Sequence, residues 1–399
     1  MAIKAASLFN GIDPVLFRKS LLQGTAVAGL LLLLLPGYAL LNRNSLYEEM
    51  DSHLASQMVN ILRAQNEHPV VQAHIDHSAT TATADKNKDG VALPAPENED
   101  SLYELLEGSI SVPAMPEKGS PSIFNLYKKP FNIPEDTTEK PVISLAVMDY
   151  GLSDSLSLSA AKSLPPEISF ILNPYSKSGQ SWSDLARKFG HELWLGLPFE
   201  NENVPNDDTG ALTLMAKSPL RRNQDTFHAI LAQVRGYVGT VGYSDGVYMA
   251  ALPVYSTIMR ENFQRGLGYM ELNPSADPAI KKQAQDMAAP YLKTAIIADP
   301  ASTDFESFEQ SLEALKLKAR FSGNAFGVIT LNQRSMQAIS AWYKTLEAEG
   351  FTLAPASALA SSSSPLAKLI EEKNQTEAPS SEETDTTSQH EEGDVLHNE

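Results

Sequence analysis

The sequence predicts an α/β fold with a parallel sheet, arranged as one compact (β/α) barrel. Between Pro141 and about Ser357, short apolar runs alternate with amphipathic stretches, which is the pattern of repeated β-then-α units. The first run, 142–148, is apolar almost throughout, as in a strand buried on both faces. About seven or eight such units in roughly 215 residues fit one barrel better than two domains.

Each expected element follows from a run or a helical stripe of apolar residues. The expected strands are 142–148, 168–172, 192–197, 240–243, 268–272, 294–298, 326–330 and 351–354. The expected helices are 153–163, 180–189, 224–235, 255–265, 280–292, 304–319 and 333–348. Residues just past the ends of barrel strands face the catalytic mouth, so Asp149, which ends the first run, is the first candidate for function.

The amino end predicts a single-pass membrane anchor. Residues 21–41 carry no charge and are long enough to cross the hydrocarbon core of a bilayer. Lys4, Arg18 and Lys19 precede them, so the positive-inside rule places residues 1–20 in the cytoplasm and the rest outside. A cleaved signal peptide is the alternative. We favour an uncleaved transmembrane helix because the apolar stretch continues and no small-x-small site follows closely.

The segments that flank the barrel differ in composition from it. Residues 45–66 have a helical apolar stripe and predict a juxtamembrane helix. Residues 67–139 are mostly polar and predict a flexible linker, in which 102–106 could form a short docking helix. Residues 140–357 form the expected domain, and the acidic stretch 358–399 predicts a disordered tail.

Charge and cysteine content exclude two classes of function. The formal net charge is −18, which argues against a nucleic-acid partner because such proteins need a basic face. The chain has no cysteine, so disulfides and thiolate metal sites are absent.

Several segments, in order, resemble one protein family. The resemblance begins with Val147-Met148-Asp149-Tyr150-Gly151-Leu152-Ser153 and continues through 164–175, 186–200, 239–246 and 265–271. These segments resemble the divergent polysaccharide deacetylases, a bacterial envelope branch of the NodB-like deacetylase fold. The resemblance implies a distorted (β/α) barrel that acts on N-acetylated or related envelope glycans. With the predicted anchor, it implies an inner-membrane protein whose carboxy-terminal domain is periplasmic.

The sequence departs from this family where the family holds its metal. In catalytic relatives, two aspartates after the first strand and histidines on later loops support a divalent metal that polarises the amide and activates water. Here the aspartate pair reads Met148-Asp149, glycine stands at the histidine positions 196 and 246, and Ile329-Thr330-Leu331 replaces a Gly-His-Pro segment. We therefore expect no metal and no other cofactor. The remaining histidines of the domain, His191 and His228, are expected to be structural.

Two sets of residues are candidates for the site. The catalytic candidates are the strand-end carboxylates Asp149, Glu200 and Glu271, because two opposed carboxyl groups suffice for acid/base hydrolysis. The binding candidates are Tyr150, Phe199, Tyr243, Asp245 and Tyr248, whose rings suit the apolar face of a sugar. In the alternative interpretation, Asp149 only caps a helix, the two glutamates bond to loops, and the rings pack in the core.

The loss of the metal ligands leads to the main functional hypothesis. We expect a pseudoenzyme that binds an envelope glycan or a cell-envelope protein. The alternative is an active carbohydrate hydrolase or deacetylase that uses Asp149 with Glu200 or Glu271. A structural scaffold with an idle cleft is a third possibility. The sequence leaves enzymatic activity open.

Overall fold

The sheet of the protein is parallel throughout, as predicted. The computed structural model describes residues 91–107, 109–131, 140–202, 209–276, 278–298 and 307–360. Within this part of the chain, nine parallel strands have the order β8-β7-β6-β5-β4-β3-β10-β9, with β11 beside β3. They are β3 (Val142–Tyr150), β4 (Ser169–Leu172), β5 (Leu193–Leu197), β6 (Gly239–Gly242), β7 (Gly268–Glu271), β8 (Tyr291–Lys293), β9 (Ile296–Ala298), β10 (Asn324–Thr330) and β11 (Thr352–Leu353).

One short segment joins the two edges of this sheet. β8 pairs with β7, and β9, which follows it directly in the chain, pairs with β10. Between them, the backbone N–H of Thr294 donates to Glu271 O, and that of Ala295 donates to Phe326 O. The strand order is therefore consistent with a distorted (β/α) barrel. The strand predicted at 294–298 corresponds to β9, whereas β8 was missed, because the sequence predicted a helix over 280–292.

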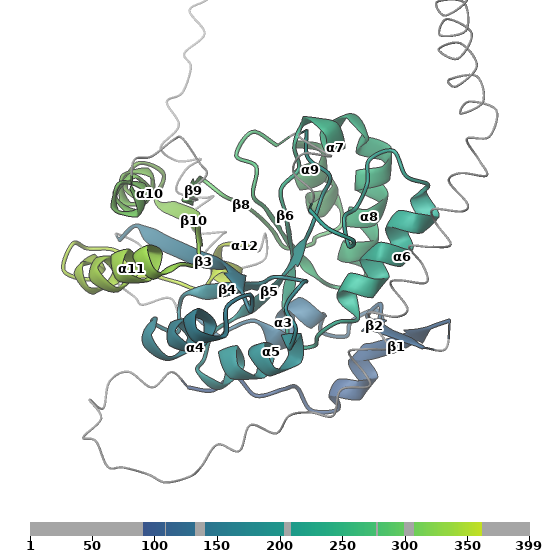
Figure 1. Cartoon of the computed structure of the whole chain (residues 1–399), viewed down its shortest axis with the longest axis horizontal. Coiled ribbons are helices and arrows are strands. Elements are labelled where there is room, and N and C mark those ends of the chain that lie inside the picture. Colours follow the sequence, from purple (N-terminus) through teal and green to yellow (C-terminus); the bar gives the residue numbers. More distant parts are fainter. Residues whose placement is uncertain are drawn as a thin grey trace, which may run out of the picture. The chain divides into compact units, whose positions relative to one another are not determined.

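Helices follow the strands and lie around the outside of the sheet (Figure 1). They are α4 (Asp154–Ser163), α5 (Gly179–Lys188), α6 (Leu220–Leu231), α7 (Gly246–Ala250), α8 (Leu252–Gln264), α9 (Pro278–Asp286), α10 (Phe308–Ser322), α11 (Gln333–Leu346) and α12 (Ala356–Ala360). The sequence analysis missed α7 and α12 because a helix of five residues is too short to show a helical period.

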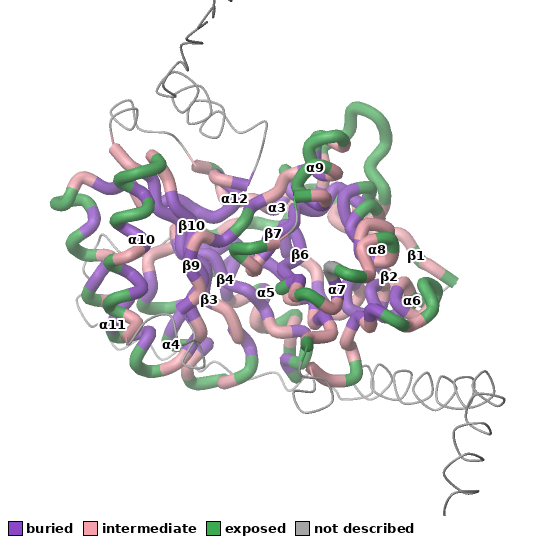
Figure 2. The backbone as a smooth tube through the Cα atoms, turned by 90° about the horizontal axis from the view of Figure 1, so that it is seen from above, coloured by how far each residue is buried: buried purple, intermediate pink, exposed green. Residues whose placement is uncertain are grey.

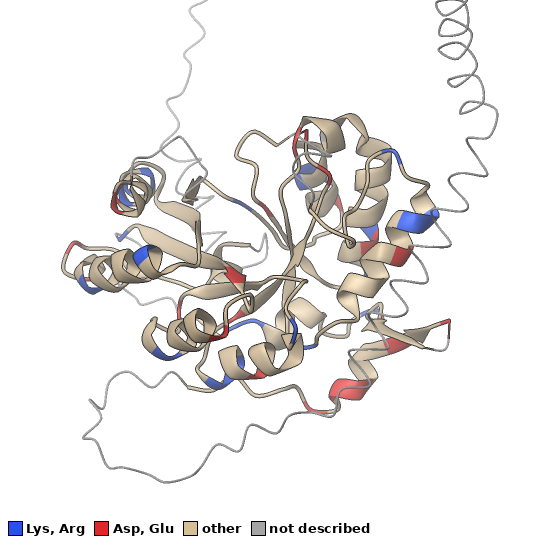
Figure 3. Ribbon diagram, viewed as in Figure 1, with Lys and Arg blue, Asp and Glu red and all other residues tan. Residues whose placement is uncertain are grey.

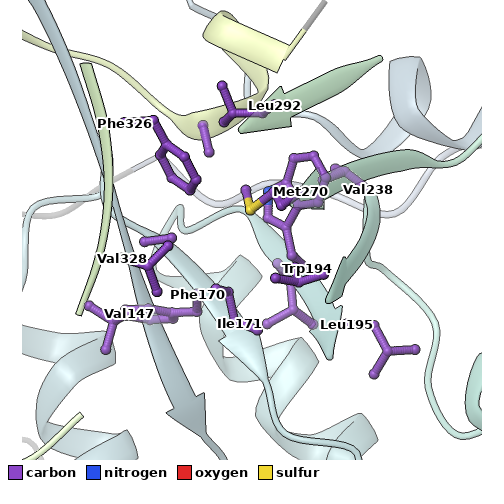
Figure 4. Packing of buried hydrophobic residues seen from close by; sticks show 14 of the residues in the cluster. Val147, Phe170, Ile171, Trp194, Leu195, Val238, Met270, Leu292, Phe326 and Val328 are labelled. Atoms are coloured by element: carbon purple, nitrogen blue, oxygen red, sulfur yellow. The ribbon is translucent and has the colours of Figure 1, made fainter. Parts of the chain in front are cut away.

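The strands carry the core. All of β4, β6 and β7 is buried, and in Figure 2 the buried tube runs through the centre while exposed segments lie on helices and loops. Figure 4 shows side chains from β3, β4, β5, β7, β8 and β10 gathered in one cluster around Trp194. Trp194 is fully buried and Trp342 on α11 is nearly so, so both are core residues.

Residues 91–131 pack onto the barrel, so this part of the predicted linker 67–139 is folded, whereas 67–90 and 132–139 lie outside the described residues. The folded part contains η1 (Glu99–Leu102), an antiparallel hairpin of β1 (Tyr103–Leu106) and β2 (Ile110–Pro113), and α3 (Ile123–Tyr127). Residues 103–106 are therefore a strand and not the docking helix that the sequence suggested. The segment has few large apolar residues, but Val112, Ile123, Phe124 and Tyr127 are all buried against the barrel.

Arg187 at the end of α5 holds this segment in place. Its guanidinium lies 4.8 Å from the centre of the Tyr127 ring and donates to Tyr127 O at 3.1 Å and to Pro94 O at 2.9 Å. Arg265 holds the hairpin of β1 and β2 on the barrel, because it donates a hydrogen bond to Pro113 O and forms an ion pair with Glu104. Buried guanidinium groups are stable only when carbonyl or carboxylate oxygens surround them, so these contacts define one docking position.

Glu192, just before β5, joins the amino-terminal segment to the last helix. Its buried carboxylate accepts hydrogen bonds from Lys129 N at 3.1 Å and Ser357 N at 3.1 Å. It also accepts hydrogen bonds from Trp194 Nε1 at 2.7 Å and Ser169 Oγ at 3.3 Å. A buried carboxylate with four donors is well satisfied, so we assign Glu192 a structural role at the amino-terminal end of the sheet.

Several predicted segments lie outside the described residues. These are the cytoplasmic segment 1–20, the transmembrane helix 21–41, the juxtamembrane helix 45–66 and the tail beyond residue 360. Of the helices that the structure describes, none has the length and apolar character needed to span a membrane.

Candidate functional site

A pocket of about 920 Å³ lies at the carboxyl ends of β3 to β7. Residues at or just after each of these strand ends line it, including Asp149, Asn173, Leu197, Gly242 and Asn273. This is the edge where the sequence placed the functional candidates. Its volume falls within the ~300–1,000 Å³ of typical ligand pockets.

Asp149 lines the pocket from an unusual backbone conformation. The register of β3 against β4 shifts between Val147 and Tyr150, and Asp149 has a φ of 65°, in the left-handed region. Such a conformation disfavours a residue with a Cβ and occurs more often at functional sites than elsewhere. Asn173 Nδ2 donates to Asp149 Oδ1 at 2.9 Å, which fixes the carboxylate beside the amide. The bulge thus holds the carboxylate at the pocket wall.

Asp245 also lines the pocket, and it organises two loops. Its Oδ1 accepts hydrogen bonds from Val247 N and Tyr248 N and so caps α7. Its Oδ2 accepts a hydrogen bond from Glu202 N at 2.7 Å, which joins the loop after β5 to the loop after β6. Asp245 therefore shapes the pocket in addition to lining it.

The two other catalytic candidates do not reach the pocket. Glu200 turns away from it, and its Oε2 accepts a hydrogen bond from Ala216 N at 2.8 Å. Glu271 is 1 % exposed and accepts hydrogen bonds from Ser244 Oγ at 2.6 Å, Tyr255 OH at 2.9 Å and Asn273 N at 2.8 Å. The structure therefore does not bring Asp149 together with either glutamate around the pocket.

Burial raises the pKa of Glu271 above its ordinary value, although the hydrogen bonds from Ser244, Asn273 and Tyr255 act in the opposite direction. This carboxylate supports the floor of the pocket. It accepts hydrogen bonds from the backbone N–H groups of Ser244 and Asn273, and both residues belong to loops that form the pocket wall. Asn273 Nδ2 also donates to Ser244 O, so the two loops are tied together above Glu271.

The aromatic candidates divide into two groups. Tyr150 and Tyr248 are fully buried and do not line the pocket, so their rings are not available to a ligand as the sequence interpretation supposed. Tyr150 stacks on Phe170 with ring centres 4.5 Å apart, whereas Tyr248 packs on Phe199 at the same distance. This packing is the alternative that the sequence analysis left open.

Phe199 and Tyr243 do line the pocket. Phe199 is 5 % exposed and forms part of its wall, whereas Tyr243 is 47 % exposed. Tyr175, which is 39 % exposed, adds a third ring, held by hydrogen bonds from its OH to Thr209 O and from Leu212 N to its OH. The rings of Tyr175 and Tyr243 combine an apolar face with a polar edge, which suits a pyranose.

The sequence analysis missed two polar residues of the site. Asn173 follows β4 as Asp149 follows β3, and neighbouring parallel strand ends meet at one edge, so its position was a usable signal. Glu202 lines the pocket in place of Glu200. The reason is the β-bridge between Phe199 and Leu214, which turns the Glu200 side chain toward Ala216. No pattern in the sequence signals that long-range bridge.

The residues present do not fit the divalent metal that the resemblance implies. A Cβ added at Gly196 would lie 3.2 Å from Pro174 Cδ, and one added at Gly246 would overlap Glu202 Oε1. Pro174 therefore leaves little room for a larger side chain at Gly196, and the Glu202 side chain occupies the space beside Gly246. Among the described residues, no group of three or more His, Asp or Glu side chains could hold a metal ion.

His191 is fully buried and far from any such role. Its Nδ1 lies 2.8 Å from Ile168 O and its Nε2 lies 3.0 Å from Ala161 O, and the ring stacks on Phe170. Burial lowers the pKa of His191 to about 4, against the effect of the two carbonyl groups. His228 on α6 faces Glu261, with 2.5 Å between Nε2 and Oε1. Both histidines occupy structural positions, as expected.

Comparisons with known proteins agree with this architecture. A family profile described as divergent polysaccharide deacetylase matches residues 146–360. The crystal structure of an uncharacterized protein from Agrobacterium tumefaciens C58 is similar, with 27 % sequence identity and a TM-score of 0.56. The similarity covers 62 % of this chain and 98 % of that one. A search of curated proteins finds no match.

Proposed function

Since the chain belongs to the divergent polysaccharide deacetylase family, we propose that its cleft binds an envelope carbohydrate without metal-dependent hydrolysis. The proposal rests on the polar and aromatic side chains that line the pocket. Asp149 and Asn173 form a fixed acid–amide pair in the same pocket as the exposed ring of Tyr243. Carboxylate and amide groups bond sugar hydroxyls, and an exposed ring stacks on the sugar face.

The alternative of an acid/base hydrolase needs a second carboxylate opposite Asp149. The two residues suggested for that role are used elsewhere. Glu200 bonds to Ala216 N, and the oxygens of Glu271 accept hydrogen bonds from the loops above it. The pairs that the sequence suggested are therefore not assembled. Two other carboxylates, Glu202 and Asp245, line the pocket with Asp149, so the test below measures hydrolysis as well as binding.

We further propose that residues 21–41 anchor the protein in the inner membrane, with the barrel in the periplasm. The uncharged stretch and the basic residues before it support this topology. It places the cleft in the compartment where envelope carbohydrates are present. Protease protection of the barrel in intact spheroplasts, with degradation only after permeabilisation, would contradict the topology.

Binding and hydrolysis can be separated on the full-length protein. We would measure binding of N-acetylglucosamine oligomers by calorimetry and acetate release with zinc, manganese or magnesium added. The expected result is that the oligomers bind and that no acetate is released. Asp149→Ala should abolish the binding. Tyr243→Ala should weaken binding by about tenfold, because a ring stacked on a ligand contributes roughly 0.5–1.5 kcal/mol beyond its buried area.

Phe321→Ala is the matched control for the ring. Phe321 on α10 is 94 % exposed and does not line the pocket, so its removal should leave binding unchanged. Acetate release that depends on Asp149 would refute the non-catalytic part of the proposal. Failure of the protein to bind any carbohydrate would refute the whole of it.

A further inference from the structure

We infer that the ligand of this cleft carries positive charge, and that its chemical class is an oligosaccharide of amino sugars with free ammonium groups. The inference rests on the proposed carbohydrate-binding function and adds the charge of the ligand to it. It follows from which charged side chains line the pocket, which of them are already neutralised, and which basic residues are near.

Three carboxylates line the pocket, and they come from three different loops. Asp149 lies at the end of β3, Glu202 follows β5, and Asp245 precedes α7. Glu202 and Asp245 are neighbours, joined by the hydrogen bond from Glu202 N to Asp245 Oδ2, whereas Asp149 lies at the end of another strand. All three line the same pocket, so their fields add over the volume that a ligand occupies.

These carboxylates keep their charge available for a ligand. Within the described chain, Asp149 accepts one hydrogen bond, from Asn173, and no cation contacts it. The carboxylate of Glu202 lies over Gly246 and has no hydrogen-bond or ion-pair partner among the described residues. Asp245 accepts only backbone N–H groups. None of the three takes part in an ion pair with a described Lys, Arg or His side chain.

No basic side chain offsets this charge in the described lining, which contains neither Lys, Arg nor His. Figure 3 shows Lys and Arg on the outer helices, among them α4, α5, α6, α10 and α11. Some of these side chains form ion pairs there, as Arg221 does with Asp225 and Lys316 with Glu349. The described lining of the pocket therefore carries negative charge without a basic side chain beside it.

The rest of the lining suits a sugar and opposes an anionic ligand. Tyr175 and Tyr243 offer ring faces, and Asn173 and Asn273 offer amides. A uronic acid or a phosphorylated sugar would bring a second negative charge against the carboxylates with no donor cation near, which costs binding energy in a partly desolvated cleft. An ammonium on a sugar ring would instead form charge-assisted hydrogen bonds to them.

The test compares three oligomers of equal length on the full-length protein at mildly acidic pH. They are glucosamine oligomers with free amines, N-acetylglucosamine oligomers and galacturonate oligomers. We expect the free-amine oligomer to bind about tenfold or more tightly than the N-acetylated one, with a preference that falls as ionic strength rises. The galacturonate oligomer should not bind.

Glu202→Gln tests the residue that carries the charge without a structural bond from its side chain. It should reduce the preference for the free amine, measured as the ratio of the dissociation constants of the two oligomers, about threefold to tenfold. Glu347→Gln is the matched control, because Glu347 is an exposed residue next to the end of α11 and does not line the pocket.

The outcomes separate the two proposals. Equal or tighter binding of the N-acetylated or galacturonate oligomer would overturn the charge inference and leave carbohydrate binding intact. A preference for the free amine that Glu202→Gln does not reduce would also overturn it, because the residue assigned to the ammonium would then be uninvolved. If no oligomer binds, the proposed function fails together with the inference.

Discussion

His191 makes a quantitative prediction about the pH dependence of stability. The ring is fully buried, and its two nitrogens face two carbonyl oxygens, although a neutral imidazole has only one N–H to donate. Protonation would satisfy both carbonyls, but it would place a charge in the core beside Phe170. Burial is the larger effect and lowers the pKa of His191 from 6.5 to about 4.

The sign and size of the effect follow from this shift. In the unfolded chain the ring gains a proton near pH 6.5, whereas in the folded protein it stays neutral until about pH 4. The unfolded state therefore binds more protons in this interval, and stability falls as the pH is lowered through it. At roughly 1.4 kcal/mol for each pKa unit, the loss between pH 7 and pH 4 is about 3 kcal/mol.

Urea denaturation of the full-length protein at a series of pH values measures this loss. The non-titrating variants His191→Gln and His191→Phe should both lose about 3 kcal/mol less than the wild type over the same interval. Their absolute stabilities will differ, because only glutamine can donate to one of the carbonyls, but their pH slopes should agree. Parallel pH profiles for wild type and variants would refute the reasoning, since they would mean that His191 titrates equally in both states.

Three further predictions concern buried positions of the barrel and can be measured by urea denaturation. Gly242→Ala should destabilise the protein by about 1–3 kcal/mol and weaken ligand binding, because the added methyl overlaps the Phe199 ring. Glu192→Ala should cost about 3 kcal/mol or more, because it leaves Trp194 Nε1 and two backbone N–H groups without an acceptor, whereas an exposed control, Glu347→Ala, should cost little. Glu271→Gln should destabilise the protein most at low pH. Because the pKa of Glu271 is raised in the folded state, its contribution to the free energy of unfolding is fully present below the ordinary pKa and is lost as the pH rises. A loss of stability in the variant that grows with pH would contradict this sign.

Much of the fold could be predicted because it is encoded in local patterns. The apolar runs predicted the described strands of the barrel other than β8 to within a few residues, and Asp149 was identified because it ends the first run. The residues of 91–131 escaped notice because their few apolar side chains are buried only by docking onto Arg187 and Arg265, far away in the sequence.

The site was predicted only in part, for a similar reason. The position of Glu271 after a strand was visible, but its burial depends on Tyr255 and Ser244, which come from other elements. Tyr150 and Tyr243 have similar local contexts, yet one ring stacks in the core and the other lies 47 % exposed at the pocket. Local sequence does not contain the packing partners that separate such cases.

The shared contact at Glu192 has a practical consequence for handling the protein. The amino-terminal segment and α12 both bond to this carboxylate, before β5 begins, whereas the cleft lies at the other end of the same strand. A label, a fusion partner or a surface attached to the amino-terminal segment or to α12 near this contact therefore lies at the end of the barrel remote from the cleft.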